Sequence, residues 1–387
     1  MTAPKLRAAL TAVLLATAAA GAGALMSAAP AEAQATVRSV VGKPLQEAQS
    51  LASQKNWKAA MAKVNEAEAA PNKTAAETQI IAQMKKYIAV NSGDVSIGGK
   101  DAALAKFAND YRAGKFRETI EDGEILRKAG ALDGQNMQIV AQAYYRAGDR
   151  AGCEKYIKQN FGSSPNDTAL ELLMRCAYEN NDEATQREAL ETLVAHTGKP
   201  EFWNNLLKIS EHVQGMRDPD TLQIYRLKLL TGTMAGKDDY ITLAQLALQL
   251  GFAAESANVL QKGQAAVKEM NDDRTNKLLK IAQGTAATDA AALSANIAKA
   301  QAAPQGEPLI KLGMQQVGNG KPKDGVATIQ AGLAKPVADK AAGQIQLGIA
   351  QYYAGEKDQA VKTFNGIKSD DKKTQMIAHL WSLAARR

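Results

Sequence analysis

Histidines, cysteines and paired carboxylates are the side chains that most often carry catalysis or hold metals, and this chain of 387 residues has few of them. The spacing of its three histidines, His196, His212 and His379, matches no zinc-binding pattern such as H-E-x-x-H. Its two cysteines, Cys153 and Cys176, are too far apart for a C-x-x-C redox or zinc motif. We therefore expect no metal site, no cofactor and no catalytic residue among them.

Two further patterns resemble chemical motifs only superficially. Segment 318–322 reads Gly-Asn-Gly-Lys-Pro, but it lacks the G-x-x-x-x-G-K-[ST] frame of a phosphate-binding loop, and its proline removes an amide donor. The acidic pairs Asp218/Asp220 and Asp238/Asp239 could supply a general acid and base, yet acidic residues are common caps at helix starts. We expect a protein that is not an enzyme. An active site of unrecognised pattern is the alternative.

Tyrosine and arginine recur two or three residues before a series of turn residues. Arginine binds carboxylates through paired hydrogen bonds and tyrosine stacks on flat groups, so these residues suit a peptide or an acidic polymer as ligand. The recurring positions are Tyr111, Arg112, Tyr145, Arg146, Tyr178, Tyr352 and Tyr353. The alternative is that the tyrosines pack between helices and the arginines are solvated.

The element that must position these side chains is a repeated helical hairpin. Small residues flank each turn, and apolar residues recur eight positions before it and nine positions after it, which predicts two closely packed helices per unit. After Gly114 the steps between turns are 33 to 36 residues long. Before it we expect a degenerate hairpin around 74–91 and a loop at 93–100. The predicted turn residues are Lys55, Gly114, Gly148, Asn181, Gly215, Gly251, Gly284, Gly320 and Gly355.

The unit length and the segments 143–150, 350–357 and 56–60 resemble tetratricopeptide repeats. This resemblance implies an all-α fold, a right-handed superhelical α-solenoid of stacked helix-turn-helix repeats. It would cover residues 44–387 with about nine or ten helix pairs and a capping helix near 372–387. In such arrays the first helices face the concave surface, so the resemblance places the seven tyrosines and arginines on a partner-binding face.

The N-terminus has the pattern of an export signal. A short basic region precedes an uncharged apolar run at 8–25, and an A-x-A site that ends at Ala33 suits signal peptidase. We expect a signal peptide at 1–33, cleaved between Ala33 and Gln34, then a short linker at 34–43 and a periplasmic protein. A retained membrane anchor is the alternative.

Export also bears on the two cysteines, because disulfides persist in oxidising compartments. In the repeat register Cys153 lies on the second helix of one hairpin and Cys176 on the first helix of the next. A disulfide between them is therefore geometrically possible. Two buried thiols are the alternative.

Charge and hydropathy narrow the class of partner. The formal net charge of +7 is spread along the chain without a dense basic block, which argues against nucleic acid. No segment after the signal peptide is apolar enough to span a membrane. The sequence therefore predicts a non-catalytic periplasmic scaffold or adaptor that binds protein partners in the cell envelope. The alternative is a binder of an extended polymer, such as a surface polysaccharide, within a secretion assembly.

Overall fold

The computed structural model describes residues 37–162 and 165–387. The expected signal peptide and its cleavage site at Ala33 and Gln34 lie outside the described residues. Within the described chain there are nineteen α-helices, one short 3-10 helix and no strands. Consecutive helices pack against their neighbours, as in a solenoid of helical repeats, so the expected all-α fold is confirmed.

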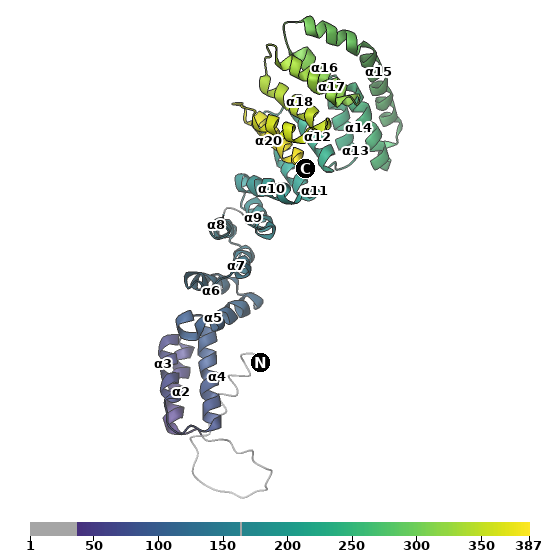
Figure 1. The fold of residues 1–387 in the computed structure, drawn as a ribbon. Coiled ribbons are helices and arrows are strands. Elements are labelled where there is room, and N and C mark those ends of the chain that lie inside the picture. Colours follow the sequence, from purple (N-terminus) through teal and green to yellow (C-terminus); the bar gives the residue numbers. More distant parts are fainter. Residues whose placement is uncertain (1–36, 163–164) are drawn as a thin grey trace. The chain divides into compact units, whose positions relative to one another are not determined.

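The described chain divides between Leu172 and Leu173 into two compact units, unit 1 before this point and unit 2 after it. Figure 1 labels helices of both. The linker that we expected at 34–43 is too long at its C-terminal end, because α2 already starts at Ser39. The helices of unit 1 are α2 (Ser39–Ser53), α3 (Trp57–Glu68), α4 (Ala75–Ser92), α5 (Val95–Arg112), α6 (Phe116–Lys128), α7 (Gly134–Arg146) and α8 (Arg150–Asn160).

The first three helices of unit 1 share a core of buried aliphatic side chains, which include Val41, Val64 and Ile88. The loop expected at 93–100 is wrong. Helix α5 begins at Val95, where the Asp94 side chain accepts a hydrogen bond from the Ser96 amide. The irregularity is confined to a kink at Gly99, whose φ of 75° is open to glycine at little cost.

Helix α9 (Asp167–Glu179) spans the boundary between the units. Unit 2 continues with α10 (Glu183–Thr197), α11 (Pro200–Glu211), α12 (Asp218–Thr231), α13 (Lys237–Gln249), α14 (Ala253–Ala266), the 3-10 turn η2 (Lys268–Met270), α15 (Asp273–Ala302), α16 (Glu307–Gly318), α17 (Pro322–Leu333), α18 (Lys340–Tyr353), α19 (Lys357–Asn365) and α20 (Lys372–Ala385).

The predicted hairpin register is confirmed at eight of its nine turns. Their turn residues have φ values from 58° to 85°, the left-handed conformation that ends a helix and reverses the chain. The apolar residue nine positions after the turn is buried in all six repeats where we identified it. These residues are Val64, Ile157, Leu190, Leu260, Ile329 and Phe364.

The turn predicted at Gly284 is wrong, because Gly284 lies inside the 30-residue helix α15. This segment is rich in alanine and has no proline, so one glycine costs about 1 kcal/mol without breaking the helix. A single helix thus stands where a hairpin was expected. The alternation of first and second helices is thereby shifted: α14 is a second helix, α16 is a first helix, and the two pack on each other.

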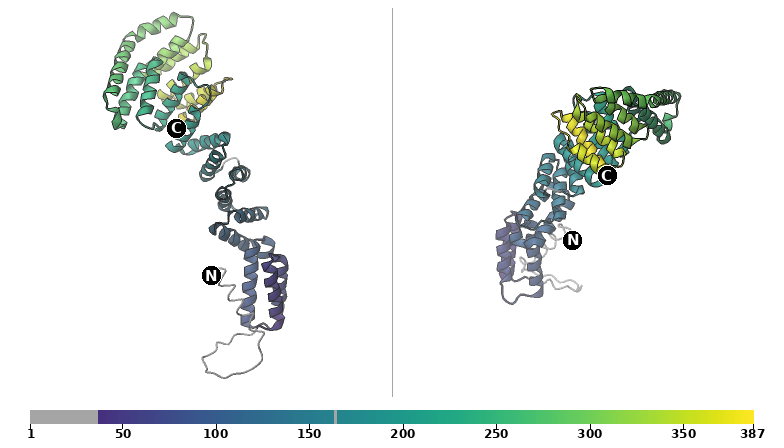
Figure 2. Two further views of the ribbon diagram at one scale, coloured as in Figure 1. Left: turned by 180° about the vertical axis from the view of Figure 1, so that it is seen from behind. Right: turned by 45° about the horizontal axis from the view of Figure 1, so that its top comes forward.

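Unit 2 also contains contacts between helices that are far apart in the sequence. Helix α20 packs on α18 and α19, and it also packs on α12 and touches α10. Its Trp381 is fully buried, with ring centroids 6.0 Å from Phe364 and 6.4 Å from Tyr352. The Lys373 ammonium donates to the Gly215 carbonyl at 2.7 Å across 158 residues of sequence. The end of the unit therefore returns to its early helices, as Figure 2 shows for the yellow and teal segments.

Candidate functional site

Two of the predicted partner-binding residues meet in unit 1. Arg146, at the end of α7, places its guanidinium carbon 5.9 Å from the ring centre of Tyr111, at the end of α5. The same guanidinium lies 5.7 Å from the ring of Phe116, which meets Tyr111 edge to face. The Tyr111 hydroxyl donates to Gln142 Oε1 at 2.8 Å. We call Tyr111, Phe116, Gln142 and Arg146 the aromatic–arginine cluster.

The chemistry of this cluster follows from the exposure of Arg146. A cation–π contact with the two rings uses none of the N–H groups of the guanidinium as hydrogen-bond donors to them. Arg146 is exposed and Tyr111 is half-buried, so the cluster presents these donors at the surface on an apolar support. Such an arrangement can bind carboxylate or carbonyl oxygens of a partner.

Sequence reasoning missed Phe116, although a signal was present. Phe116 stands two residues after the turn at Gly114, and Trp57 and Arg150 stand two residues after their own turns. Arg150 places its guanidinium carbon 4.0 Å from the centre of the Tyr145 ring. The second residue after a turn can therefore contact a side chain near the end of a first helix, as Phe116 contacts Arg146 and Arg150 contacts Tyr145.

The other predicted residues are distributed differently. Arg112 is exposed and donates to Asn109 Oδ1 at 3.1 Å on its own helix. Tyr178 is 66% exposed. Tyr352 packs on Trp381 and on Tyr353, and burial raises its pKa. Tyr111 and Arg146 therefore contact each other, whereas Tyr352 packs between helices, which was the alternative prediction for the tyrosines.

Tyr353 lines a pocket of about 130 Å³ in unit 2 with Arg226 and Glu255. Arg226 is 3% exposed, and its Nη1 donates to Gln223 at 3.2 Å and to Gln346 at 3.3 Å. Tyr353 remains 46% exposed, but its crowded surroundings and the nearby Glu255 carboxylate raise its pKa to about 12. No repeat position in the sequence singled out Arg226, because its partners come from three different helices.

A buried ion cluster holds α5 against α6 close to the aromatic–arginine cluster. The Lys106 ammonium lies 2.7 Å from Asp122 Oδ1 and 2.8 Å from Asp110 Oδ2. Asp110 also contacts Lys115 at 3.3 Å. Burial raises the pKa of Asp122 despite this cation. Both carboxylates are directed at lysines of their own hairpin, so the cluster has a structural role.

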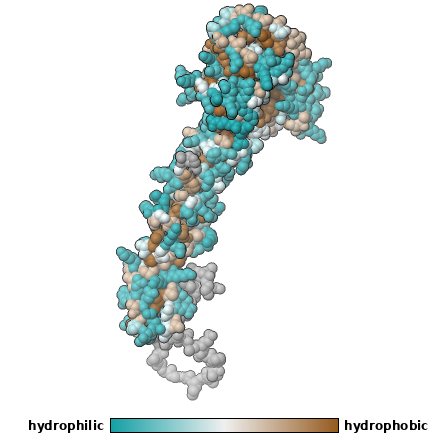
Figure 3. Space-filling model, in the orientation of Figure 1, coloured by the Kyte–Doolittle hydropathy of each residue, from teal (hydrophilic) through white to brown (hydrophobic). Residues whose placement is uncertain are grey.

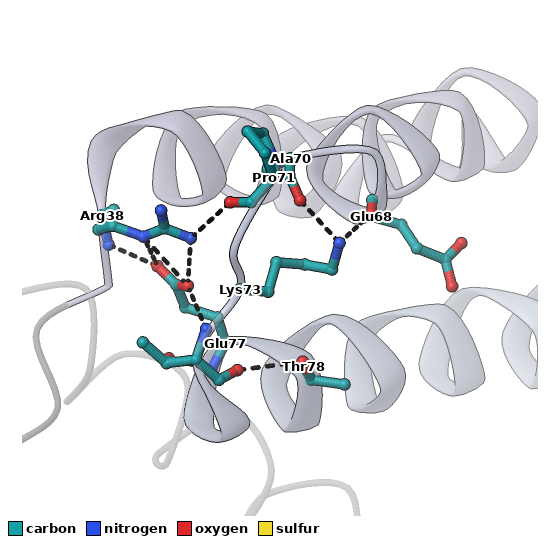
Figure 4. Close-up of polar contacts among 8 residues, drawn as sticks. Arg38, Glu68, Ala70, Pro71, Lys73, Glu77 and Thr78 are labelled. Carbon is teal, nitrogen blue, oxygen red and sulfur yellow. Dashed lines mark hydrogen bonds and ion pairs between the residues drawn. The ribbon is translucent and has the colours of Figure 1, made fainter.

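A second buried carboxylate fastens the start of the described chain (Figure 4). Glu77 accepts from Arg38 at Nε, 2.9 Å, and at Nη2, 2.8 Å, and its Oε1 accepts from the Arg38 amide. It also forms a capping box with Thr74 at the start of α4. These hydrogen bonds lower the pKa of Glu77 to about 2, and those from the Arg38 side chain have a larger effect than the one from the Thr74 amide. Nearby, Lys73 donates to the carbonyls of Glu68 and Ala70.

One member of each acidic pair considered as a general acid or base has a structural partner. Asp220 Oδ2 accepts from the Arg217 amide at the start of α12, and Asp239 lies 2.9 Å from Lys228. Gly320 forms the turn between α16 and α17, as we predicted in place of a phosphate loop. Within the described ranges, no three His, Cys, Asp or Glu side chains are grouped so that they could hold a metal ion.

The two cysteines occupy the helices that the repeat register gave them. Cys153 lies in α8 and Cys176 in α9, and both are fully buried. Both are disulfide-bonded. Among the helices that the structure describes, none has the length together with the apolar character that crossing a bilayer requires.

Neither the family models nor the curated proteins include a match to this chain. The surface that Figure 3 shows is mostly hydrophilic, with hydrophobic side chains in scattered patches between polar ones.

Proposed function

We propose that this protein is a non-catalytic adaptor of the bacterial cell envelope, built of tetratricopeptide-like repeats. It is exported by the signal peptide at 1–33 and acts in the periplasm. It binds an extended segment of another protein through the aromatic–arginine cluster of unit 1. The observation that carries the proposal is the exposed Arg146, whose guanidinium carbon lies within cation–π distance of the rings of Tyr111 and Phe116.

The chemistry of the cluster supports a peptide as the ligand. Tyrosine and arginine are enriched among the residues that dominate binding energy, because they combine a large contact area with hydrogen bonding. The hydrogen bond from Tyr111 to Gln142 fixes the ring, so less side-chain entropy is lost on binding. The disulfide-bonded cysteines support an oxidising compartment such as the periplasm.

Site-specific photo-crosslinking in intact cells tests this proposal. A photoreactive residue at Arg112, beside the cluster, should give one or a few crosslinked envelope proteins. The same residue at the exposed Gln83 of α4 should not give them. Arg146→Ala should weaken binding of the crosslinked partner about 10-fold or more. Arg146→Lys should restore only part of it, because an ammonium lacks the planar stacking geometry.

Equal crosslinking at Arg112 and Gln83 would contradict the proposal, since it would show encounters without a preferred surface. Undiminished binding by Arg146→Ala would contradict the role of the cluster itself. Circular dichroism of each variant confirms the fold. A large loss of helix signal in Arg146→Ala is not expected, because Arg146 is exposed.

A further inference from the structure

A groove in unit 1 runs between α3 and α4, and the first turn of α5 borders one end of it. Its volume is about 420 Å³, and it is open to solvent along its length. It shares no residue with the aromatic–arginine cluster. Because a cavity of about 150 Å³ holds a benzene ring, the groove has room for about two or three large apolar side chains.

The floor of the groove is apolar. Met61 of α3 and Ile81 of α4 are almost fully buried beneath it. Ala82 is exposed, and Ala89 and Ile97 are half-buried, so apolar surface remains uncovered along the groove. Since the exposed side chains in the middle are small, larger apolar side chains of a partner can enter between the two helices.

The kink in α5 leaves this groove uncovered. Gly98 lies so close to α4 that a Cβ atom there would come within 2.6 Å of the Ala89 carbonyl oxygen. The chain then bends at Gly99, and no residue of α5 beyond the kink lines the groove. A further helix therefore has access to the surface that α3 and α4 form together.

Lysines give the rim of the groove a positive charge. Lys73 donates to the carbonyls of Glu68 and Ala70 at one end, where Figure 4 shows it reaching the end of α3. Lys85 is paired with Glu68 at 2.6 Å, and the exposed Lys86 has no ion-pair partner among the described residues. The lining contains these three lysines and this one glutamate, so its net charge is +2.

Neighbouring charges do not cancel this excess. Glu77 is paired with Arg38 on the buried side of α4. Lys63 pairs with Glu47 and Glu66 away from the groove, on the side of α3 that faces α2. The remaining charged residues within one turn of the lining are two lysines and two aspartates, Lys58, Lys100, Asp94 and Asp101. The groove therefore favours a ligand that carries negative charges beside apolar groups.

We propose that this groove binds an amphipathic helix of a protein partner, with apolar side chains on one face and acidic side chains along its edges. The groove follows α4 from Thr78 to Ala89, a length of about 16 Å, which matches about three turns of helix. Apolar side chains spaced three and four residues apart enter between α3 and α4, and the acidic edges face Lys73 and Lys86. A helix suits this open groove better than a lipid chain, because small ligands bind where most of their surface is enclosed.

Isothermal titration calorimetry on the full exported chain tests this inference with synthetic peptides of about 12 residues. Each peptide is stapled on its solvent face, because short free helices are only marginally stable. The first has leucines on one face and glutamates along both edges. The second has lysines in place of the glutamates, and the third has serines in place of the leucines. We expect saturable binding of the first peptide and at least about 10-fold weaker binding of the other two.

Two variants of α4 locate the binding surface. Ala82→Glu places a charge and added bulk in the middle of the groove, so it should weaken binding of the glutamate–leucine peptide at least about 10-fold. Gln83→Glu is the matched control, since it adds the same charge at the next position, which is exposed and does not line the groove. It should weaken binding less than about 2-fold. Neither variant should change the melting temperature, because both positions are exposed.

The inference is overturned if the glutamate–leucine peptide does not bind at millimolar concentration, or if either of the other peptides binds equally well. Equal binding by Ala82→Glu and Gln83→Glu would also overturn it, because the peptide would then lie elsewhere on the chain. Sedimentation with phosphatidylglycerol vesicles that Ala82→Glu abolishes, without binding of the peptide, would assign the groove to lipid instead.

Discussion

The guanidinium of Arg226 in α12 and the carboxylate of Glu255 in α14 form a two-point contact, with Nε 2.7 Å from Oε1 and Nη2 2.5 Å from Oε2. Arg226 also donates to Gln346 of α18, which lies 120 residues further along the chain. This pair therefore connects three helices that are not adjacent in sequence. Its partner groups are needed because Arg226 is almost fully buried.

Glu255→Gln should lower the free energy of unfolding of unit 2 by about 3–5 kcal/mol, because it leaves a buried cation without its counter-charge. Urea unfolding followed by circular dichroism measures the change. Glu269→Gln, at an exposed position of η2, should change stability by less than about 0.5 kcal/mol. If the two variants unfolded at the same urea concentration, the pair would have no such role.

Trp381→Ala should destabilise unit 2 by about 3–5 kcal/mol, since it removes a large, fully buried side chain. The location of the effect is more informative than its size. Because α20 packs on α12, hydrogen exchange should become faster in α12 (Asp218–Thr231) as well as in α19. An array with contacts between sequence neighbours alone would leave α12 unchanged.

The exposed Lys372, at the start of the same helix, provides the control for this experiment. Lys372→Ala should leave exchange in α12 as it is in the unmodified chain. Faster exchange confined to α18 and α19 in Trp381→Ala would show that the return of α20 to α12 adds nothing to stability.

The hairpins could be predicted from sequence because a helix end imposes local requirements. A left-handed turn favours glycine or asparagine, and close helix packing favours small residues, so both recur with the repeat. The turn predicted at position 284 was wrong because residue type alone does not distinguish a glycine inside an alanine-rich helix from a glycine at a turn. The conformation there is decided by the alanines around it.

The candidate site was less predictable because its contacts are not periodic. Tyr352 and Tyr353 are neighbours of the same type, yet the first packs on Trp381 and the second lines a pocket with Arg226. Which of the two is available depends on where α20 returns, and that is a contact between distant segments. The pairing of Arg146 with Tyr111 followed the repeat distance and could be anticipated in part.

Acid should lower the stability of unit 1, because it protonates the Glu77 carboxylate. Its pKa in the folded state is lowered from 4.5 to about 2, so the carboxylate stabilises the fold above pH 4.5. This contribution is lost as the pH falls from about 4.5 to 2. The melting temperature of Glu77→Gln should therefore depend less on pH in this range than that of the unmodified chain.

The control for the acid titration is Glu121→Gln, which changes an exposed carboxylate of α6. It should keep the full pH dependence. A fall in melting temperature between pH 4.5 and 2 that was as steep in Glu77→Gln as in Glu121→Gln would assign the acid sensitivity to other groups.

Alkali should lower the stability of unit 2, because it deprotonates the Tyr353 phenol. The crowded surroundings of its ring and the Glu255 carboxylate raise its pKa from 10.0 to about 12, so the fold favours the neutral phenol. A raised pKa contributes stability that is present below about pH 10 and is lost as the pH rises through 12. Several tyrosines of this chain have a raised pKa, so absorbance at 295 nm should show a late phenolate component, and Tyr353→Phe should lower its amplitude near pH 12 by one tyrosine. Glu255→Gln should shift this component to lower pH, whereas Tyr178→Phe, which changes a side chain that is 66% exposed, should leave it in place. An undiminished amplitude near pH 12 in Tyr353→Phe would show that Tyr353 does not titrate there.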